Sequence, residues 1–178
     1  MMPLMLAALL AVQSSPVTVS RLASPEKALR FEVTVPASVE DVWTAFTTAA
    51  GLQTWLWSDV VVDLKPGGDW LVRFPGRSGA PGSTGGGTSV SFVPKQRLEL
   101  RALAPDRFPT VRQDRTRAVF EFQPVGPQST KVTMTQTGWK TGKEWEEAYE
   151  YLAAGNAELL QQLHTRFTKG PIEWPKIK

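Results

Sequence analysis

The segment from Lys143 to about Phe167 constrains the fold most, because one long helix explains its whole pattern. Apolar side chains recur there every three or four residues for roughly 25 residues, which predicts an amphipathic helix. At about 1.5 Å per residue such a helix is roughly 37 Å long, enough to cross an entire sheet. Gly155 interrupts the pattern at a cost of about 1 kcal/mol relative to alanine. Gly170-Pro171 ends it, so the fold has to bury one apolar stripe along a single C-terminal helix.

Segments of alternating apolar and polar residues precede this helix. Phe31, Val33 and Val35 occupy every second position of 29–35, which places them on one face of a strand. The same period recurs in six further segments, near residues 60–64, 70–74, 90–93, 97–102, 117–122 and 132–135. Such one-sided strands are typical of an antiparallel sheet with one face in water. The sequence therefore predicts about seven strands.

Two short helices are predicted after the first strand. Ser38 has the side chain of an N-cap and Asp41 follows three residues later, which favours a helix start. An apolar stripe follows at helical spacing, made by Val39, Val42, Trp43 and Phe46. Residues 49–51 (Ala-Ala-Gly) are expected to interrupt this helix, and 52–57 to form a second helical turn.

This order of elements predicts an α+β domain in which a curved antiparallel sheet wraps around the long helix, because that arrangement buries both apolar faces. The 178 residues suit one domain. We divide the chain into a signal peptide (1–15), a linker (16–27), the domain (28–168) and a C-terminal tail (169–178). A single helix cannot fill the hollow of so broad a sheet, so the remaining space is either a cavity or is packed by large aromatic side chains.

The N-terminal segment predicts export. Residues 3–12 are a run of ten apolar residues, too short for the roughly 20 that span a bilayer. The run is similar to the apolar core of a secretory signal, with small residues nearby for cleavage around Gln13 to Ser15. It predicts a periplasmic or secreted protein that does not span the membrane. Because no Lys or Arg precedes the run, an N-terminal core helix in a cytoplasmic protein stays an alternative.

Composition excludes several kinds of chemistry. The chain has no cysteine, which excludes disulfides, thiolate zinc sites and cysteine nucleophiles. His164 is the single histidine, so we expect no metal site and no cofactor, and assign no catalytic residue. The Gly-rich segment 76–87 lacks the Gly-Lys-Ser/Thr ending of a phosphate loop and is predicted to be a strand connector. A net charge of +3 with scattered arginines predicts no nucleic-acid partner. No pattern indicates an oligomeric state.

Asn156 is the most specific candidate for a ligand contact. It falls on the inward stripe of the long helix between Leu152 and Leu159, where an apolar residue is expected. An unpaired buried amide costs about 1–3 kcal/mol, so Asn156 should bond to protein, water or a ligand. The predicted wall of the cavity combines it with aromatic and aliphatic side chains: Trp43, Trp55, Trp70, Phe74, Phe92, Phe120, Met134, Tyr149, Leu152 and Asn156. The alternative is that these aromatic residues only fill the core.

Four motifs in order carry a resemblance to a known superfamily. Residues 31–47 run from a strand ending in Val-Pro-Ala into a helix with Val-Trp, and three further motifs lie at 52–56, 64–68 and 93–98. Together they resemble the START-like (SRPBCC, Bet v 1-like) superfamily over residues 28–168. The resemblance is closest to the bacterial branch related to the activator of the heat-shock protein 90 ATPase.

The resemblance implies the helix-grip fold, with a cavity between the sheet and the C-terminal helix. Members bind lipids, polyketides or other apolar molecules, and some catalyse cyclisation. Many relatives carry Gly-Trp where this chain has Gly155-Asn156, a change that would enlarge or polarise the pocket. We therefore predict binding of an apolar small molecule or lipid. The alternatives are a cyclase or hydrolase that uses Asn156 with a nearby tyrosine or carboxylate, and a chaperone-ATPase-activating module that acts through its surface.

Overall fold

The computed structural model describes residues 15–76 and 82–175, which form an α+β domain. Eight antiparallel strands make one unclosed sheet in the order β1-β2-β8-β7-β6-β5-β4-β3. The strands are β1 Thr18–Leu22, β2 Ala28–Val35, β3 Val60–Val62, β4 Asp69–Phe74, β5 Ser83–Val93, β6 Arg97–Ala102, β7 Thr116–Gly126 and β8 Ser129–Thr137. The helices are α1 Val39–Thr47, α2 Ala49–Gln53, α3 Pro109–Asp114 and α4 Lys143–Lys169.

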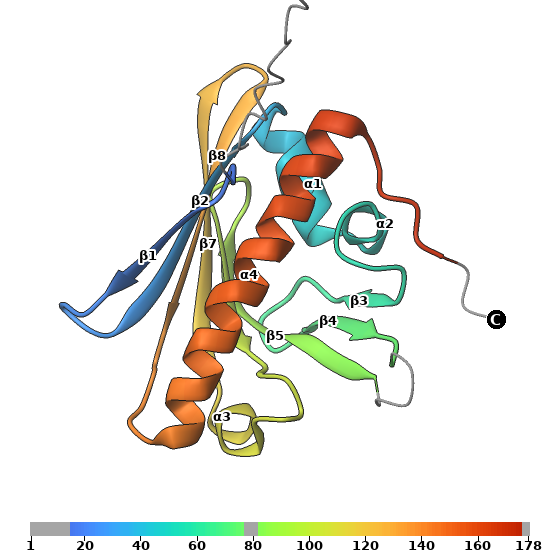
Figure 1. Cartoon of the computed structure of the whole chain (residues 1–178). Helices are drawn as coiled ribbons and strands as arrows, with labels where there is room; N and C mark the ends of the chain where they lie inside the picture. The colour runs from blue at the N-terminus through green and yellow to red at the C-terminus, as the bar shows by residue number, and fades with distance from the viewer. Residues whose placement is uncertain (1–14, 77–81, 176–178) are drawn as a thin grey trace, which may run out of the picture.

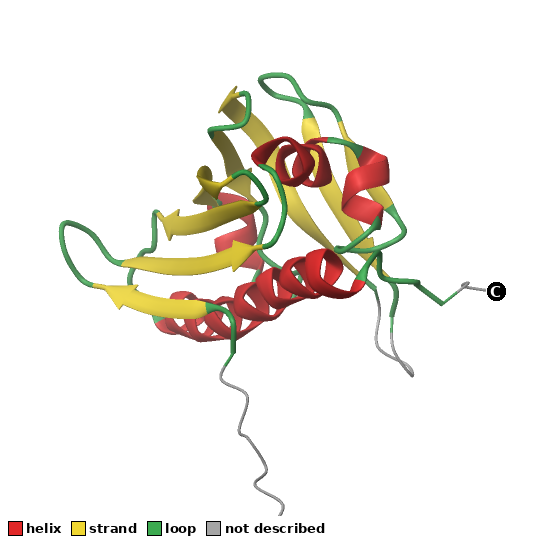
Figure 2. Cartoon of the chain, turned by 90° about the horizontal axis from the view of Figure 1, so that it is seen from above, coloured by secondary structure: helices red, strands yellow, loops and turns green. Residues whose placement is uncertain are grey.

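Helix α4 lies along the inner face of the curved sheet, as the amphipathic pattern predicts. Figure 1 shows α3 near its N-terminal end and α1 and α2 beside its C-terminal half. Figure 2, seen along the layers, shows the sheet bending around the helix. The buried side chains of α4 recur at helical spacing, among them Trp145, Leu160 and Leu163. The predicted helix-grip architecture is confirmed.

The core lies where the central strands meet α1 and α4. Strand register places Phe31 of β2 opposite Met134 of β8, which in turn pairs with Phe120 of β7 and through it with Leu98 of β6. All four side chains are buried on the inner face. The alternation read from the sequence therefore fixes which face of each strand points inward.

Helix α1 starts as predicted, and α2 starts earlier than predicted. The Asp41 amide donates to Ser38 Oγ across 3.1 Å, which caps α1. The chain leaves α1 at Thr48, whose extended backbone ends the helix and whose Oγ1 accepts from the Gly51 amide at 2.9 Å. Helix α2 thus includes residues 49–51, which were expected to be the break. Gly51 fits there because a Cβ would lie 2.2 Å from the Thr44 carbonyl oxygen.

Three further features differ from the expectations. The predicted linker 16–27 contains β1, which pairs with β2 from Thr18↔Glu32 to Leu22↔Ala28 and raises the strand number from about seven to eight. Helix α3 was not expected; its N-terminus is held by the Glu144 carboxylate, which accepts from the Thr110 amide at 2.7 Å. The Gly-rich segment is only partly a connector, because Ser83 to Gly87 belong to β5.

The segment that predicts a signal peptide lies outside the described residues, so export stays a prediction. Within 15–76 and 82–175, no helix combines the length and the apolar character needed to cross a bilayer.

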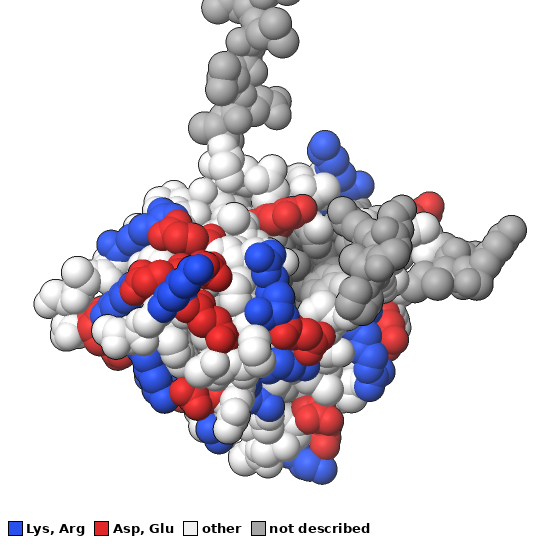
Figure 3. Space-filling view, turned by 60° about the horizontal axis from the view of Figure 1, so that its bottom comes forward, with Lys and Arg blue, Asp and Glu red and all other residues white. Residues whose placement is uncertain are grey.

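Acidic and basic side chains are interspersed on the surface. Figure 3 shows one such face, on which blue and red side chains alternate without a broad area of one sign. Several of these charges are paired, including Arg21 with Glu150 and Lys27 with Glu146, both at 2.7 Å. Exposed pairs of this kind add at most about 1 kcal/mol each to stability.

Glu99 is the exception, because its side chain is only 12% exposed. The hydrogen bond from Arg117, helped by Arg97, lowers the pKa of Glu99 to about 2 from an ordinary 4.5. A pKa lowered by folding stabilises the protein above pH 4.5, and this contribution is lost as the pH falls toward 2.

We expect the free energy of unfolding to fall by about 2 kcal/mol between pH 5 and pH 2 through Glu99 alone. The variant Glu99→Gln should lack that part of the slope, because glutamine does not titrate. Urea unfolding followed by circular dichroism at stepped pH measures both proteins. Equal slopes for the two would contradict the assignment.

Candidate ligand-binding cavity

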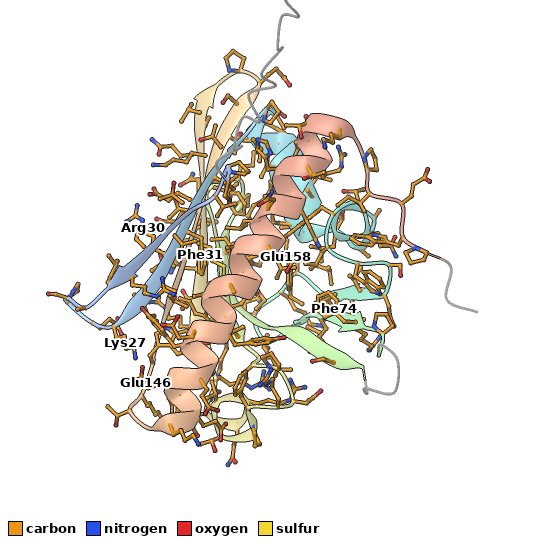
Figure 4. All side chains as sticks on the ribbon, viewed as in Figure 1. Lys27, Arg30, Phe31, Phe74, Glu146 and Glu158 are labelled. Carbon is orange, nitrogen blue, oxygen red and sulfur yellow. The ribbon has the colours of Figure 1, made fainter. Side chains whose placement is uncertain are left out.

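A cavity of about 550 Å³ opens between α4 and strands β4–β8 of the sheet. Figure 4 shows Phe74 from β4 and Glu158 from α4 on the side of the helix that faces these strands. Most of its wall is aromatic or aliphatic, and the polar part of the wall comes mainly from α4 and β8. It is lined by Trp55, Leu56, Trp57, Trp70, Val72, Phe74, Ser83, Gly85, Gly86, Leu100, Ala102, Leu103, Pro105, Ala118, Phe120, Met134, Gln136, Tyr151, Leu152, Gly155, Asn156, Glu158, Leu159, Leu160 and Gln162.

Small residues on facing elements leave this space empty. Gly85, Ala102 and Ala118 lie on three neighbouring strands, and Gly155 lies on the helix opposite them. A Cβ on Gly155 would meet no atom within 4 Å, so the helix at that point borders open space. Strands β4 and β5 come so close at Gly86 that only glycine fits there. Its φ is +97°, and a Cβ would lie 2.1 Å from the Trp70 carbonyl oxygen. The hollow is thus a consequence of side-chain size.

Two tryptophans of the wall are held by backbone acceptors of α1. The indole N–H of Trp55 donates to the Ala45 carbonyl at 2.9 Å, and that of Trp70 donates to the Phe46 carbonyl at 2.7 Å. Both side chains are buried. Their polar atoms are satisfied away from the cavity, so each presents an apolar ring surface to it.

Two linked side-chain hydrogen bonds join the sheet to α4 beside the cavity. Asn156 Nδ2 donates to Gln136 Oε1 at 2.9 Å, and Gln136 Nε2 donates to Thr116 Oγ1 at 2.8 Å. All three residues are buried, with Asn156 8% exposed. Protein, water and ligand were the partners open to Asn156, and the structure shows a protein partner, Gln136. Among the described residues, no donor reaches the Oδ1 atom of Asn156.

The rim of the cavity is aromatic at both ends of its helical wall. Tyr151 is 45% exposed near α3, where its ring meets Phe108 in an edge-to-face contact at 5.5 Å. At the other end Trp57 lies 4.7 Å from Trp174 of the C-terminal tail. Trp174 is fixed by its indole N–H, which donates to the Gln53 carbonyl at 2.6 Å. The tail therefore packs on the aromatic rim.

Seven of the ten residues proposed from the sequence lie together on the cavity wall: Trp55, Trp70, Phe74, Phe120, Met134, Leu152 and Asn156. Their contact with a ligand remains a prediction.

The other three proposed residues lie outside the cavity. Trp43 packs edge-to-face on Phe122, with ring centroids 5.5 Å apart, and the Phe92 ring lies 6.5 Å from that of Trp43. The Tyr149 hydroxyl donates to the Ala28 carbonyl at 3.1 Å, which ties α4 to β2. Burial there raises the pKa of Tyr149. Tyr149 is therefore not on the cavity wall with Asn156.

Sequence reasoning missed several wall residues, and one of them had a clear signal. Gln136 continues the period of two that places Val132 and Met134 inside, so it was readable as an inward polar residue. To predict Tyr151, Glu158 and the glycines as wall residues, one must know which side of α4 faces β5. Periodicity does not provide that orientation.

A second, more open hollow of about 360 Å³ lies between α1, α2 and the end of α4. Polar groups dominate it, including Asp41, Thr44 and Arg166. Within the described ranges no three His, Asp or Glu side chains converge so as to hold a metal ion. The larger, apolar cavity is therefore the candidate site.

Comparisons with known proteins agree with this fold. Residues 36–168 match the family model described as activator of Hsp90 ATPase homolog 1-like protein. No curated protein matches the sequence.

Solved structures with the same fold have low sequence identity. The Aha1 dimer from Colwellia psychrerythraea is 19% identical, with a TM-score of 0.61 over 80% of this chain and 97% of that one. Protein MLL2253 from Mesorhizobium loti is 16% identical, with a TM-score of 0.62 over 82% and 99%. DynU16, from the dynemicin biosynthetic locus, is 20% identical, with a TM-score of 0.62 over 83% of this chain and 49% of that one. The structural likeness shows the fold, and the family model, which spans most of the sequence, shows that the chain belongs to the activator of Hsp90 ATPase homolog 1-like family.

Proposed function

We propose that this protein binds an apolar small molecule or lipid in the cavity between α4 and strands β4–β8 of the sheet. The observation that carries the proposal is the cavity itself: about 550 Å³ of space with a mainly apolar wall. Ligand sites in proteins are usually concave, about 300–1,000 Å³ in volume, and lined by apolar side chains with a few polar groups. The size and the wall of this cavity fit that description.

The energetics of protein cores argue against a packing defect as the origin of the cavity. Cores pack to high density, and residual cavities cost about 24 cal/mol per Å³ when they are made by truncating side chains. Around this cavity large side chains such as Trp70 and Phe120 are available, yet glycine and alanine occupy the facing positions. A space that is kept open against this cost supports a role in holding a guest.

Titration with the apolar fluorophore N-phenyl-1-naphthylamine tests the proposal. Its emission rises on transfer from water to an apolar site, and the tryptophans of the wall lie close enough to transfer excitation energy to it. We expect a saturable increase with one site per chain. An increase that never saturates, or none at all, would contradict the proposed function.

A further inference from the structure

The charges around the cavity distinguish between classes of ligand. Among its described wall residues Glu158 is the only one with a formal charge, and it is acidic. It is exposed and forms no ion pair with another described residue. No lysine or arginine of the described ranges lines the cavity. An anionic group that entered would lose its hydration without gaining a cation, which strongly disfavours it.

The buried end of the cavity offers a hydrogen-bond acceptor. Asn156 is 8% exposed and lines the cavity. Its Nδ2 donates to Gln136 Oε1 at 2.9 Å, which fixes the orientation of the amide. Its Oδ1 atom accepts from no described residue, so it has free capacity toward the cavity. The Oδ1 atom is not fully enclosed, so water can reach it through the cavity, and a ligand hydroxyl or N–H could take the place of that water.

One basic residue near the rim does not change this balance. Arg107 lies over the Tyr151 ring, 5.1 Å from its centroid. Arg107 is exposed, where water and salt screen its attraction for an anion. Because the one charged residue of the described wall is the acidic Glu158, Arg107 alone does not make the site selective for acids.

We propose that the ligand is an uncharged amphiphile, an apolar body bearing a hydroxyl or amide N–H that donates to Asn156 Oδ1. This rests on the proposed function and narrows it from any apolar molecule to alcohols and amides. Free fatty acids, which are anionic at neutral pH, are disfavoured.

The test compares three ligands, each built on a straight ten-carbon chain, in displacing N-phenyl-1-naphthylamine from the full-length protein at pH 8. These are 1-decanol, decanoate, and methyl decanoate, which has no hydrogen-bond donor. We expect 1-decanol to displace the probe at a concentration at least tenfold lower than decanoate, and also lower than methyl decanoate.

Two variants connect these preferences to the residues. In Asn156→Leu the advantage of 1-decanol over methyl decanoate should disappear, while the probe still binds. In Glu158→Lys, a change at an exposed position of the wall, the concentration of decanoate needed for displacement should fall relative to that of 1-decanol. Urea unfolding of both variants verifies that they fold, and the wild-type comparison does not depend on either.

The possible results separate this inference from the proposed function. If decanoate displaces the probe as well as 1-decanol does, the ligand class is wrong although the cavity binds. If Asn156→Leu keeps the advantage of 1-decanol, the role of Asn156 Oδ1 is wrong. If the probe itself does not bind to the wild-type protein, the proposed function fails, and this inference fails with it.

Discussion

The variant Gly155→Trp is expected to bind N-phenyl-1-naphthylamine at least about tenfold more weakly than the wild-type protein, a loss of about 1.4 kcal/mol or more in binding free energy. Gly155 lies on the cavity wall, and a Cβ there meets nothing within 4 Å. An indole can therefore enter the cavity and occupy the space that the ligand needs. Fluorescence titration of the purified variant measures the loss.

Two neighbouring changes serve as controls for this effect. Ala154→Trp places the same side chain one residue earlier, at an exposed position of α4, and should leave binding unchanged. Gly155→Ala should keep binding and raise the free energy of unfolding by up to about 1 kcal/mol, because alanine favours a helix. If Gly155→Trp and Ala154→Trp bind the probe equally well, the probe does not occupy this cavity.

The variant Phe46→Ala is expected to lower the free energy of unfolding by about 3–5 kcal/mol. Phe46 is 0% exposed at the centre of an aromatic cluster. Its ring lies 4.9 Å from Trp55, 5.2 Å from Phe120 and 5.0 Å from Phe122, measured between ring centroids. Truncation removes all three contacts and leaves a void that the rigid rings around it cannot fill. Urea unfolding followed by circular dichroism measures the change.

The matched control for Phe46→Ala is Val125→Ala. Val125 is 53% exposed on β7, so its truncation should change stability by less than about 0.5 kcal/mol. A cost of less than about 1.5 kcal/mol for Phe46→Ala would mean that the ring is not packed as the structure describes.

The sequence allowed most of the fold to be predicted because each element carried its own period. The alternation of Phe31, Val33 and Val35 and the helical stripe of α4 each depend on one buried face, which local spacing reveals. Strand β1 was not predicted from the sequence, because it is an edge strand of five residues whose burial pattern does not alternate. Its pairing with β2 is a long-range property.

The site was predicted less completely, for a physical reason. Periodicity tells which residues point inward but not which part of the interior is filled. Tyr149 and Asn156 share the inward stripe of α4, yet Tyr149 packs toward β2 and Asn156 faces the cavity. That difference arises from the small side chains of β5, β6 and β7, whose effect appears only when the strands are placed opposite the helix.

The position of Met134 allows the central claim to be tested inside the protein. Met134 is 7% exposed and lines the cavity. The remaining methionines of the chain are Met1, Met2 and Met5. The Met134 methyl signal in a spectrum of ¹³C-methyl-methionine-labelled protein is therefore a local reporter, assigned by its loss in Met134→Leu.

Titration of 1-decanol or N-phenyl-1-naphthylamine into this labelled protein is the most direct measurement. The account predicts that the Met134 methyl resonance shifts progressively and saturates at one ligand per chain. A Met134 resonance that stays in place while ligand is added in excess would contradict the presence of an apolar guest between α4 and the sheet.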